Sequence, residues 1–401
     1  MTTATFTPEQ SAALSRLRSV RDDMTTALVG REREIDGLCL SLLANAHTLF
    51  IGVPGTAKSL MATEFARAIG LDPKSEDYFE ILLGAFSNPD EVFGPYNPAK
   101  ILDGVYERNV DGYLPTAQFG FMDEIFNASQ EMLTTLNTIL NERRMKQGTQ
   151  RLDCPLRMVV GAANVYPQGD LALAALYDRF LLRFWTPYVE TREDKRRLLR
   201  IARDGGVKFS QKLDDGDVEI VRAACDAVHV PDELLDLLVD VEFALRDEGV
   251  VVSDRRSMAQ VKLVKARAAL DGRAVATARD LFVLADSVWD THEQRPVVWK
   301  TIAKIVDSSL LAARALFDAV LVEAESVDLQ KRDEANDTRR PAKRARAALN
   351  AKIADAMRSI ESLPGVDTSD EQIATMLAKL ANMKRSVARS IARLDMRLPS
   401  A

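Results

Sequence analysis

Residues 52–59, Gly-Val-Pro-Gly-Thr-Ala-Lys-Ser, have the composition of a loop that binds phosphate. They follow the apolar run His47–Ile51 and precede the helical pattern Leu60–Ala66, which predicts a strand, a loop and a helix. In such a loop, successive backbone amides and a helix N-terminus face an anion. Lys58 can reach the β- and γ-phosphates, and the Ser59 hydroxyl can ligate Mg²⁺. The spacing indicates a nucleoside triphosphate site, against the alternative of a turn that binds nothing.

Ala57 departs from the usual pattern, which has glycine directly before the lysine. We expect the methyl group to be a small change, on the condition that the backbone φ angle at this residue is negative. The sequence alone leaves that angle open.

Two adjacent carboxylates, Asp123 and Glu124, end the apolar run that begins at Phe119. Neighbouring acids repel each other, so their presence suggests a nearby cation or a proton to move. Asp123 suits Mg²⁺ coordination, directly or through water, and Glu124 suits the polarisation of an attacking water. Alone, such a pair is as often a helix N-cap. Together with a phosphate loop, the catalytic interpretation is favoured.

Asn164 follows a third apolar run, Met158–Ala163. An uncharged amide there can hydrogen-bond the γ-phosphate or the lytic water without adding negative charge. A turn asparagine is an equal alternative on local evidence, because Pro167 and Gly169 follow closely.

Arg179 lies late in the helical pattern Ala174–Phe180 and just before the apolar run Leu181–Phe184. Its guanidinium is a planar, permanently charged donor fork, the group that stabilises charge on a transferring phosphoryl. Alone, the pair Asp178–Arg179 is more often a local ion pair. Its place after the Asn164 strand favours the catalytic interpretation.

These residues require elements that bring them together. From about residue 25 to 190, apolar strands alternate with helical stretches, which is typical of a parallel sheet covered on both faces. Residues 191–295 lack clear strand signals and carry helical ones, such as those of 231–235 and 258–264.

The order of the motifs resembles that of the AAA+ ATPases, and their details resemble the MoxR family, most closely its RavA branch. The resemblance covers roughly residues 20–300, and RavA-like members often carry the same alanine before the lysine. The supporting segments are Leu28–Glu32, Ala57–Ser59, Phe121–Ile125, Ile139–Arg143, Leu176–Phe180 and Val252–Arg256.

The resemblance implies a fold and a domain order. The fold class is α/β, an AAA+ P-loop ATPase core with a parallel sheet, followed by an α-helical lid and a C-terminal helical hairpin. The expected domains are an N-terminal helix (1–24), the nucleotide-binding core with a helix-2 insert (25–190), the lid (191–300) and a helical extension with the hairpin (301–401). A nucleotide clamped between core and lid lets hydrolysis become domain motion.

The resemblance also assigns roles within one chain. Lys58 and Ser59 would bind phosphate and Mg²⁺, Asp123 would support the metal, and Glu124 would activate water. The residues expected to contact ATP are Val29, Gly30, Gly52, Pro54, Gly55, Thr56, Ala57, Lys58, Ser59 and Leu60.

Three more residues are expected around the γ-phosphate. Asn164 resembles the first sensor, and Arg255 resembles a second sensor that reaches from the lid. Because Arg256 is adjacent, the phase of the helix decides between the two arginines, and we expect Arg255. Arg179 resembles a finger that acts on the nucleotide of a neighbouring subunit, which implies an oligomer.

Two segments resemble inserts of the same clade. Residues 82–96, rich in turn formers and aromatics, look like the helix-2 insert, and residues 144–149 look like the tip of a second hairpin. In that clade such loops face the central channel or a partner. A well-packed surface loop is the alternative.

The last part of the chain is basic. Residues 326–401 hold 15 Lys+Arg and 10 Asp+Glu, although the whole chain has a net charge of −6. Apolar residues recur at spacings of three and four along 349–360 and 373–394, and Ser362–Val366 supplies a turn, so we predict a helical hairpin. Its basic face is more often a solvated surface than a nucleic-acid site. We expect it to dock on another subunit or an acidic partner.

The composition fits an ordinary soluble protein of two or three domains, with 47% hydrophobic and 28% charged residues in 401. We find no apolar run of membrane-spanning length and no signal-peptide pattern at the start, so we expect a cytoplasmic protein. The three cysteines and three histidines are scattered. Free buried thiols and structural histidines are therefore expected rather than a metal cluster.

These observations favour an ATP-driven remodeller, a hexameric ring that reshapes or matures a client protein. Partners with a von Willebrand A domain are common among MoxR-like ATPases and are implied by resemblance alone. A nucleic-acid motor of the helix-2-insert clade is the alternative, against which the acidic pI near 5.4 argues. A scaffold that binds ATP without turnover would need a defective Glu124, Asn164 or Arg179, and all three are present.

Overall fold

The computed structural model describes residues 5–102, 104–148, 150–166, 171–205, 208–214, 216–327, 336–363, 366, 368 and 371–395. Its centre is a five-stranded sheet of order β2-β3-β6-β1-β7, and every neighbouring pair is parallel. The strands are β1 (His47–Ile51), β2 (Tyr78–Leu82), β3 (Phe119–Asp123), β6 (Met158–Ala163) and β7 (Phe180–Trp185). The predicted α/β class and parallel sheet are confirmed.

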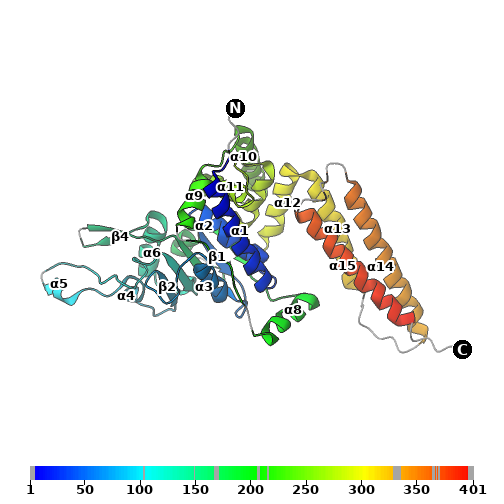
Figure 1. The fold of residues 1–401 in the computed structure, drawn as a ribbon, viewed down its shortest axis with the longest axis horizontal. Helices are drawn as coiled ribbons and strands as arrows, with labels where there is room; N and C mark the ends of the chain where they lie inside the picture. Colours follow the sequence, from blue (N-terminus) through cyan, green and yellow to red (C-terminus); the bar gives the residue numbers. More distant parts are fainter. Residues whose placement is uncertain are drawn as a thin grey trace. The chain divides into compact units, whose positions relative to one another are not determined.

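Helices of the core pack on this sheet (Figure 1). Helix α2 (Glu32–Leu43) contacts β1 and β7, and α3 (Lys58–Ala68) contacts β3 and β6. The packing of α2 is close, because a Cβ atom added at Gly37 would lie 2.1 Å from the Phe184 ring. The other core helices are η1 (Ile125–Asn127), α6 (Gln130–Glu142) and α7 (Leu171–Tyr177).

Helical structure follows the last strand, as expected for a lid. The elements are α8 (Arg192–Arg203), α9 (Asp217–Asp226), α10 (Asp232–Asp247), α11 (Asp254–Leu270), η2 (Ala278–Asp286) and α12 (Gln294–Val306). Helices α9 and α11 contact α2 and also the N-terminal helix α1 (Pro8–Ala27).

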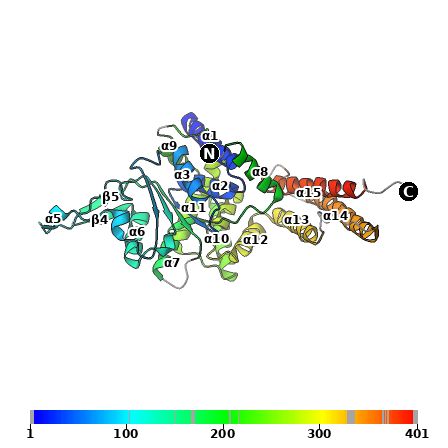
Figure 2. The ribbon, with the colours of Figure 1, turned by 90° about the horizontal axis from the view of Figure 1, so that it is seen from below.

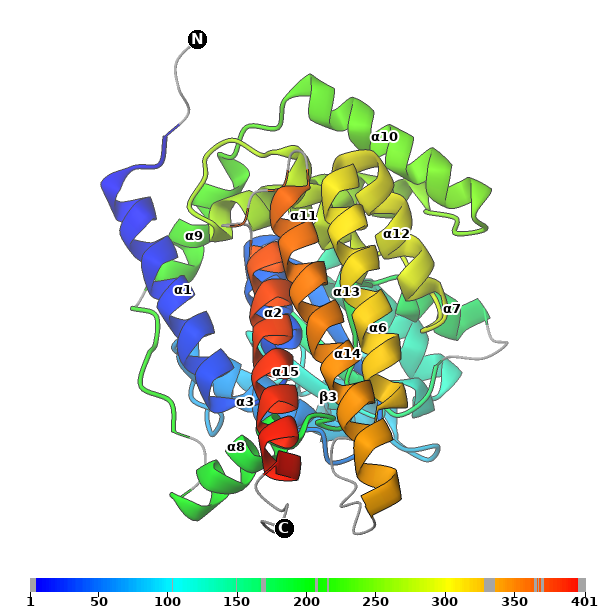
Figure 3. The same cartoon turned by 90° about the vertical axis from the view of Figure 1, so that its right-hand side faces the viewer.

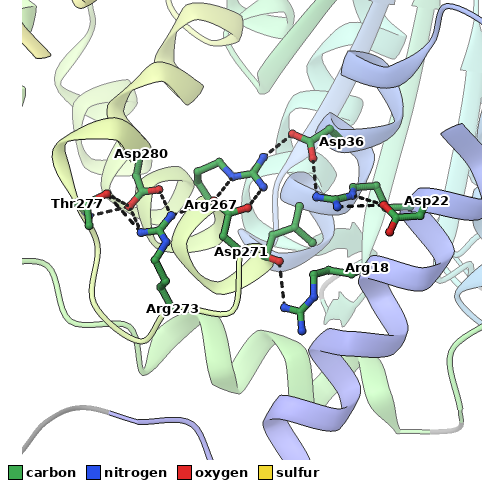
Figure 4. A network of polar contacts seen from close by, with 10 residues as sticks. Arg18, Asp22, Asp36, Arg267, Asp271, Arg273, Thr277 and Asp280 are labelled. Carbon is green, nitrogen blue, oxygen red and sulfur yellow. Dashed lines mark hydrogen bonds and ion pairs between the residues drawn. The ribbon is translucent and has the colours of Figure 1, made fainter. Parts of the chain in front are cut away.

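A chain of ion pairs links α1, α2 and α11 (Figure 4). Asp36 of α2 accepts a hydrogen bond from Arg267 of α11 at 2.6 Å and lies 3.6 Å from Arg21 of α1. Arg267 also pairs with Asp271, which in turn pairs with Arg273. The network therefore fixes one end of α11 to the core.

The two segments predicted to be inserts, 82–96 and 144–149, lie at the same end of the sheet (Figures 1 and 2). The first contains α4 (Pro89–Phe93), but it extends beyond the predicted bounds through α5 (Pro98–Leu102) to Arg108, which forms a β-bridge with Tyr96. The second is the antiparallel pair β4 (Arg144–Gln147) and β5 (Gln150–Asp153). Gln147 donates a hydrogen bond to the Arg108 carbonyl at 2.8 Å, so the two inserts contact each other. The first also carries exposed apolar side chains, among them Leu102, which is 89% exposed.

The chain divides into two compact units, residues 1–298 and 299–401. The second contains α13 (Ser308–Ser326), α14 (Asn336–Ser362) and α15 (Glu371–Asp395), which pack on one another (Figure 3). The predicted hairpin of α14 and α15 is confirmed, and its buried side chains include Leu349, Ile353, Ile360, Ile373, Met376, Leu380 and Val387. Pro364 and Gly365, predicted to form the turn, lie outside the described residues.

The three cysteines and His47 match the structural expectation, whereas His229 and His292 are exposed. Cys39, Cys154 and Cys225 are free and buried, and burial raises the pKa of the Cys154 thiol to about 11. His47 is buried, with Nε2 3.0 Å from the Leu140 carbonyl and Nδ1 accepting from the Val159 amide at 2.9 Å. No group of metal-ligating side chains occurs in the part of the chain that the structure describes, and no helix there is long and apolar enough to cross a membrane.

Candidate functional site

The phosphate-loop sequence lies at the carboxyl end of β1, the strand between β6 and β7. A Cβ atom at Gly52 would lie 2.4 Å from the Thr186 carbonyl oxygen, so this glycine lets the loop start close to the end of β7. Gly55 has a φ of +77° and open space where its Cβ would be. The loop then enters α3 at Lys58, so the α3 N-terminus ends the loop, as predicted.

Ala57 adopts a left-handed conformation, with φ +67° and ψ +25°. The condition that φ be negative, on which we expected its methyl group to be a small change, is therefore not met. An L-residue in this region costs roughly 1–2 kcal/mol more than in the right-handed region, and glycine avoids that cost. The loop keeps the backbone shape of a glycine at a position occupied by alanine.

The Lys58 side chain lies buried beneath the loop. Its ammonium donates to the Gly52 carbonyl at 2.6 Å and to Asn164 Oδ1 at 2.9 Å, and it lies 3.4 Å from the Ala163 carbonyl. Burial lowers the pKa of Lys58, while the nearby charges of Asp123 and Glu124 act in the opposite direction. The structure thus brings Lys58 close to the polar residues at the carboxyl ends of β3 and β6, which are Asp123, Glu124 and Asn164.

Asn164 connects Lys58 to Glu124. Its Oδ1 accepts from the lysine, and its Nδ2 donates to Glu124 Oε1. Glu124 has a φ of +52°, a strained conformation for a non-glycine residue. Its backbone amide donates to Asp123 Oδ1 at 3.0 Å, which orients the Asp123 carboxylate.

The residues present fit a nucleoside triphosphate with Mg²⁺. The loop combines an open space at Gly55 with a buried ammonium that can be redirected to phosphate oxygens. Ser59 is exposed in the first turn of α3 and Asp123 is half-buried at the end of β3, the hard oxygen donors that Mg²⁺ prefers. The metal would supply charge neutralisation between the phosphates.

Arg31 is a residue of this site that sequence reasoning missed, although the segment Leu28–Glu32 contains it. Its buried guanidinium donates to the carbonyls of Thr56 at 3.1 Å, Gly30 at 2.9 Å and Pro187 at 2.6 Å. It therefore joins the phosphate loop to the segment after β7. Of the other predicted ATP contacts, Val29 is buried and Leu60 is 37% exposed on α3.

A buried carboxyl lies beside this arginine. Glu34 Oε1 is 3.6 Å from Arg31 Nη1, and burial raises the pKa of Glu34 to about 7 despite the positive charge of Arg31. The anchor of the loop thus includes a carboxyl that titrates near neutral pH.

Arg179 lies apart from these residues, in the turn between α7 and β7. Helix α7 ends at Tyr177, so the predicted position within the helix is wrong by two residues. Its Nε and Nη1 atoms are buried and have no hydrogen-bond partner among the described residues. The alternative of a local ion pair with Asp178 is not observed, because Asp178 pairs with Arg256.

The two arginines at the start of α11 differ in environment. Arg255 is exposed, and Arg256 is 5% exposed. Arg256 Nε donates to Asp178 Oδ1 at 3.2 Å, and Nη2 lies 3.3 and 3.4 Å from the Asp178 and Phe180 carbonyls. Burial and Arg183 lower the pKa of Arg256 to about 10. The phase of α11 therefore exposes Arg255 to solvent and buries Arg256.

Arg183, in the middle of β7, is a second residue that the sequence did not single out. Its buried guanidinium donates to the Trp289 carbonyl at 2.7 Å and to Asp290 at 3.0 Å, and it lies 3.6 Å from the Tyr177 ring centre. An arginine in an apolar strand could have signalled a buried polar contact, but the sequence does not show its partners.

Comparisons with known proteins identify the family of the chain and support its fold. Residues 15–238 match the model of the MoxR domain in the MoxR-vWA-beta-propeller ternary systems, and residues 233–302 match an AAA lid domain. Two uncharacterized proteins of Methanocaldococcus jannaschii are 31% and 32% identical over 79% and 78% of this chain, and 78% and 82% of their own.

Two further proteins are more distant. The chaperone MoxR1 of Mycobacterium tuberculosis is 24% identical over 76% of this chain and 81% of its own. A crystal structure described as a candidate ATPase of Cytophaga hutchinsonii superposes with a TM-score of 0.58 at 20% identity, over 74% of this chain and 95% of its own, which supports the fold. The family model covers more than half of the chain, so the chain belongs to the MoxR family of AAA+ ATPases.

Proposed function

We propose that this chain hydrolyses ATP with Mg²⁺ in a hexameric ring and uses the cycle to remodel or mature a client protein. Lys58 and Ser59 bind phosphate and metal, Asp123 supports the metal, and Glu124 activates the attacking water. Arg255 acts as second sensor from the lid. Asn164, between Lys58 and Glu124, aligns the base and senses the γ-phosphate.

The ring is proposed on one observation, the state of Arg179. Two of its guanidinium nitrogens are buried without a partner among the described residues, which is costly for a charged group. Because no described residue of its own chain holds these nitrogens, the side chain can turn toward the phosphate of a nucleotide bound to a neighbouring subunit. The site of one chain would then be complete only when a second chain contributes its finger.

The test is the ATPase rate per subunit as a function of protein concentration, with mass measured in parallel. We expect the specific activity to rise as rings form, because a finger contributes about 10³–10⁵ in rate. Glu124→Gln should abolish turnover and leave rings and ATP binding intact. A rate that does not depend on concentration would favour a monomeric switch instead.

Two further parts of the proposal, a partner with a von Willebrand A domain and closeness to the RavA branch, have less support. A partner with a von Willebrand A domain is supported by the description of the matched family model, which belongs to systems that contain one. Affinity of the purified chain for such a protein, present with ATP and absent with ADP, would test it. Closeness to the RavA branch rests on the six segments given above, with the alanine before Lys58 as the feature shared with RavA-like members, and it remains a prediction.

The client site is proposed to be the pair of inserts. They contact each other through Gln147 and Arg108, and the first exposes Leu102 and Tyr106, at 89% and 64%. Leu102→Ser should lower the stimulation of ATPase activity by a client and leave the basal rate unchanged.

A further inference from the structure

Arg256 lies where the lid meets the turn that carries Arg179. It is in the first turn of α11, directly after the exposed Arg255, and it is almost fully buried. Its partners are the Asp178 carboxylate and carbonyl, the Phe180 carbonyl and the Ser287 carbonyl. Arg256 therefore contacts the residues on both sides of Arg179.

The Arg179 side chain does little to fix its own position. Two of its nitrogens have no partner in the described part of the chain, so its place depends on the backbone of the turn. Arg183 supports the same turn from β7, since its Nε lies 3.2 Å from the Phe180 carbonyl. Arg183 also bonds Trp289 and Asp290, downstream of η2. Both arginines thus tie the turn to the helical region after β7.

We propose that Arg256 is a positioning residue, which sets the finger turn according to the position of the lid. Arg255 and Arg256 are adjacent on one rigid helix, so a movement of α11 relative to the core moves both arginines. The Asp178–Phe180 turn moves with Arg256, and Arg179 with the turn. The position of the lid would thereby set the finger that each subunit offers to its neighbour. This inference rests on the proposed role of Arg179.

The first test compares Arg256→Gln and Asp178→Asn with wild type in assembled rings. A small displacement of a catalytic group can cost about 10²-fold in rate, so we expect a loss of about 10–100-fold in kcat for both. ATP affinity should stay within about twofold, because neither residue is placed at the nucleotide of its own chain. Combined with Arg179→Ala, neither should slow the enzyme further. A wild-type rate in both variants would overturn the proposal.

Arg267→Gln is the matched control. Arg267 is on the same helix and also pairs with a core carboxylate, Asp36 (Figure 4). Asp36 is not part of the finger turn. General loosening of the lid would affect both variants alike. A rate loss in Arg267→Gln equal to that in Arg256→Gln would overturn the specific role in positioning.

Mixed rings separate a defect in trans from one in cis. Glu124→Gln subunits keep their fingers, so an excess of them should restore turnover in Arg179→Ala and in Arg256→Gln subunits. The double variant Glu124→Gln/Arg256→Gln should fail to restore Arg179→Ala. If turnover were restored in Arg179→Ala subunits but not in Arg256→Gln subunits, the positioning role of Arg256 would be wrong, whereas the finger role of Arg179 would stand. Failure to restore either would overturn the finger as well, and with it this proposal.

Discussion

The phosphate-loop edge and the finger turn differ in how far their polar groups are satisfied within one chain. At the loop edge, Lys58, Asn164 and Glu124 bond one another in a continuous series. At the finger turn, the backbone is bonded by Arg183 and Arg256, while Arg179 itself has buried nitrogens without a partner in the described residues. One region is self-contained, and the other holds a charged group that its own chain leaves without a partner among the described residues. The difference predicts which substitutions act in cis and which in trans.

The largest expected effect contrasts the two regions directly. Arg179→Ala should lower kcat by about 10³–10⁵ while ATP affinity changes little, because the finger is proposed to act on another subunit's nucleotide. Lys58→Ala should lose both affinity and turnover. Binding of a fluorescent ATP analogue and steady-state rates would measure the two effects.

Arg203→Ala serves as the control for Arg179→Ala, because Arg203 is an exposed arginine of α8 that pairs with its neighbour Asp204. It should behave as wild type. If Arg179→Ala lost ATP affinity as Lys58→Ala does, Arg179 would act in its own chain, and the contrast between the regions would disappear.

Asn164→Ala tests the self-contained region. It removes the hydrogen bond to Glu124 and one from Lys58, and loss of a single well-placed catalytic donor costs roughly 10²–10³ in kcat. We expect a loss of about 10²-fold that an excess of Glu124→Gln subunits does not restore, since the defect is in cis. Asn382→Ala, in the C-terminal unit, is the control. Restoration in mixed rings would show that Asn164 acts between subunits.

The sequence predicted the strands and polar residues of the phosphate-loop edge well, but it did not predict the contacts that hold the finger turn. Buried parallel strands appear as continuous apolar runs, so the bounds of β1 and β6 agree with the predicted runs, and the polar residues at their ends follow. The contacts of Arg183 and Arg256 join residues more than 70 positions apart and depend on helix phase and tertiary packing. Local patterns contain no signal for such contacts.

The anchor of the phosphate loop predicts a pH dependence of stability. The pKa of Glu34 is raised from 4.5 to about 7 by burial, so the folded state binds this proton more tightly than the unfolded state does. Its contribution is complete below about pH 4.5 and is lost as the pH rises to about 7. A pKa difference of this size corresponds to roughly 3 kcal/mol at most.

Glu34→Gln should remove that dependence. We expect wild type to lose unfolding free energy relative to Glu34→Gln between pH 4.5 and 7, measured by urea unfolding at each pH. Glu32→Gln, an exposed neighbour at the start of α2, is the control and should follow wild type. Parallel curves for wild type and Glu34→Gln would show that the Glu34 carboxyl is not stabilised in its neutral form by the fold.

The smallest expected effect concerns the strain at Ala57, which lies within the self-contained region. Ala57→Gly should raise the unfolding free energy by about 1 kcal/mol, because alanine at a positive φ is destabilised by more than the added chain entropy of glycine. Gly55→Ala is the mirror experiment in the same loop, since Gly55 also has a positive φ and open space at its Cβ position. It should lower stability by a similar amount. Equal shifts of opposite sign in thermal unfolding would show that backbone conformation alone sets both values, whereas a destabilised Ala57→Gly would mean that the methyl group makes contacts worth more than the strain.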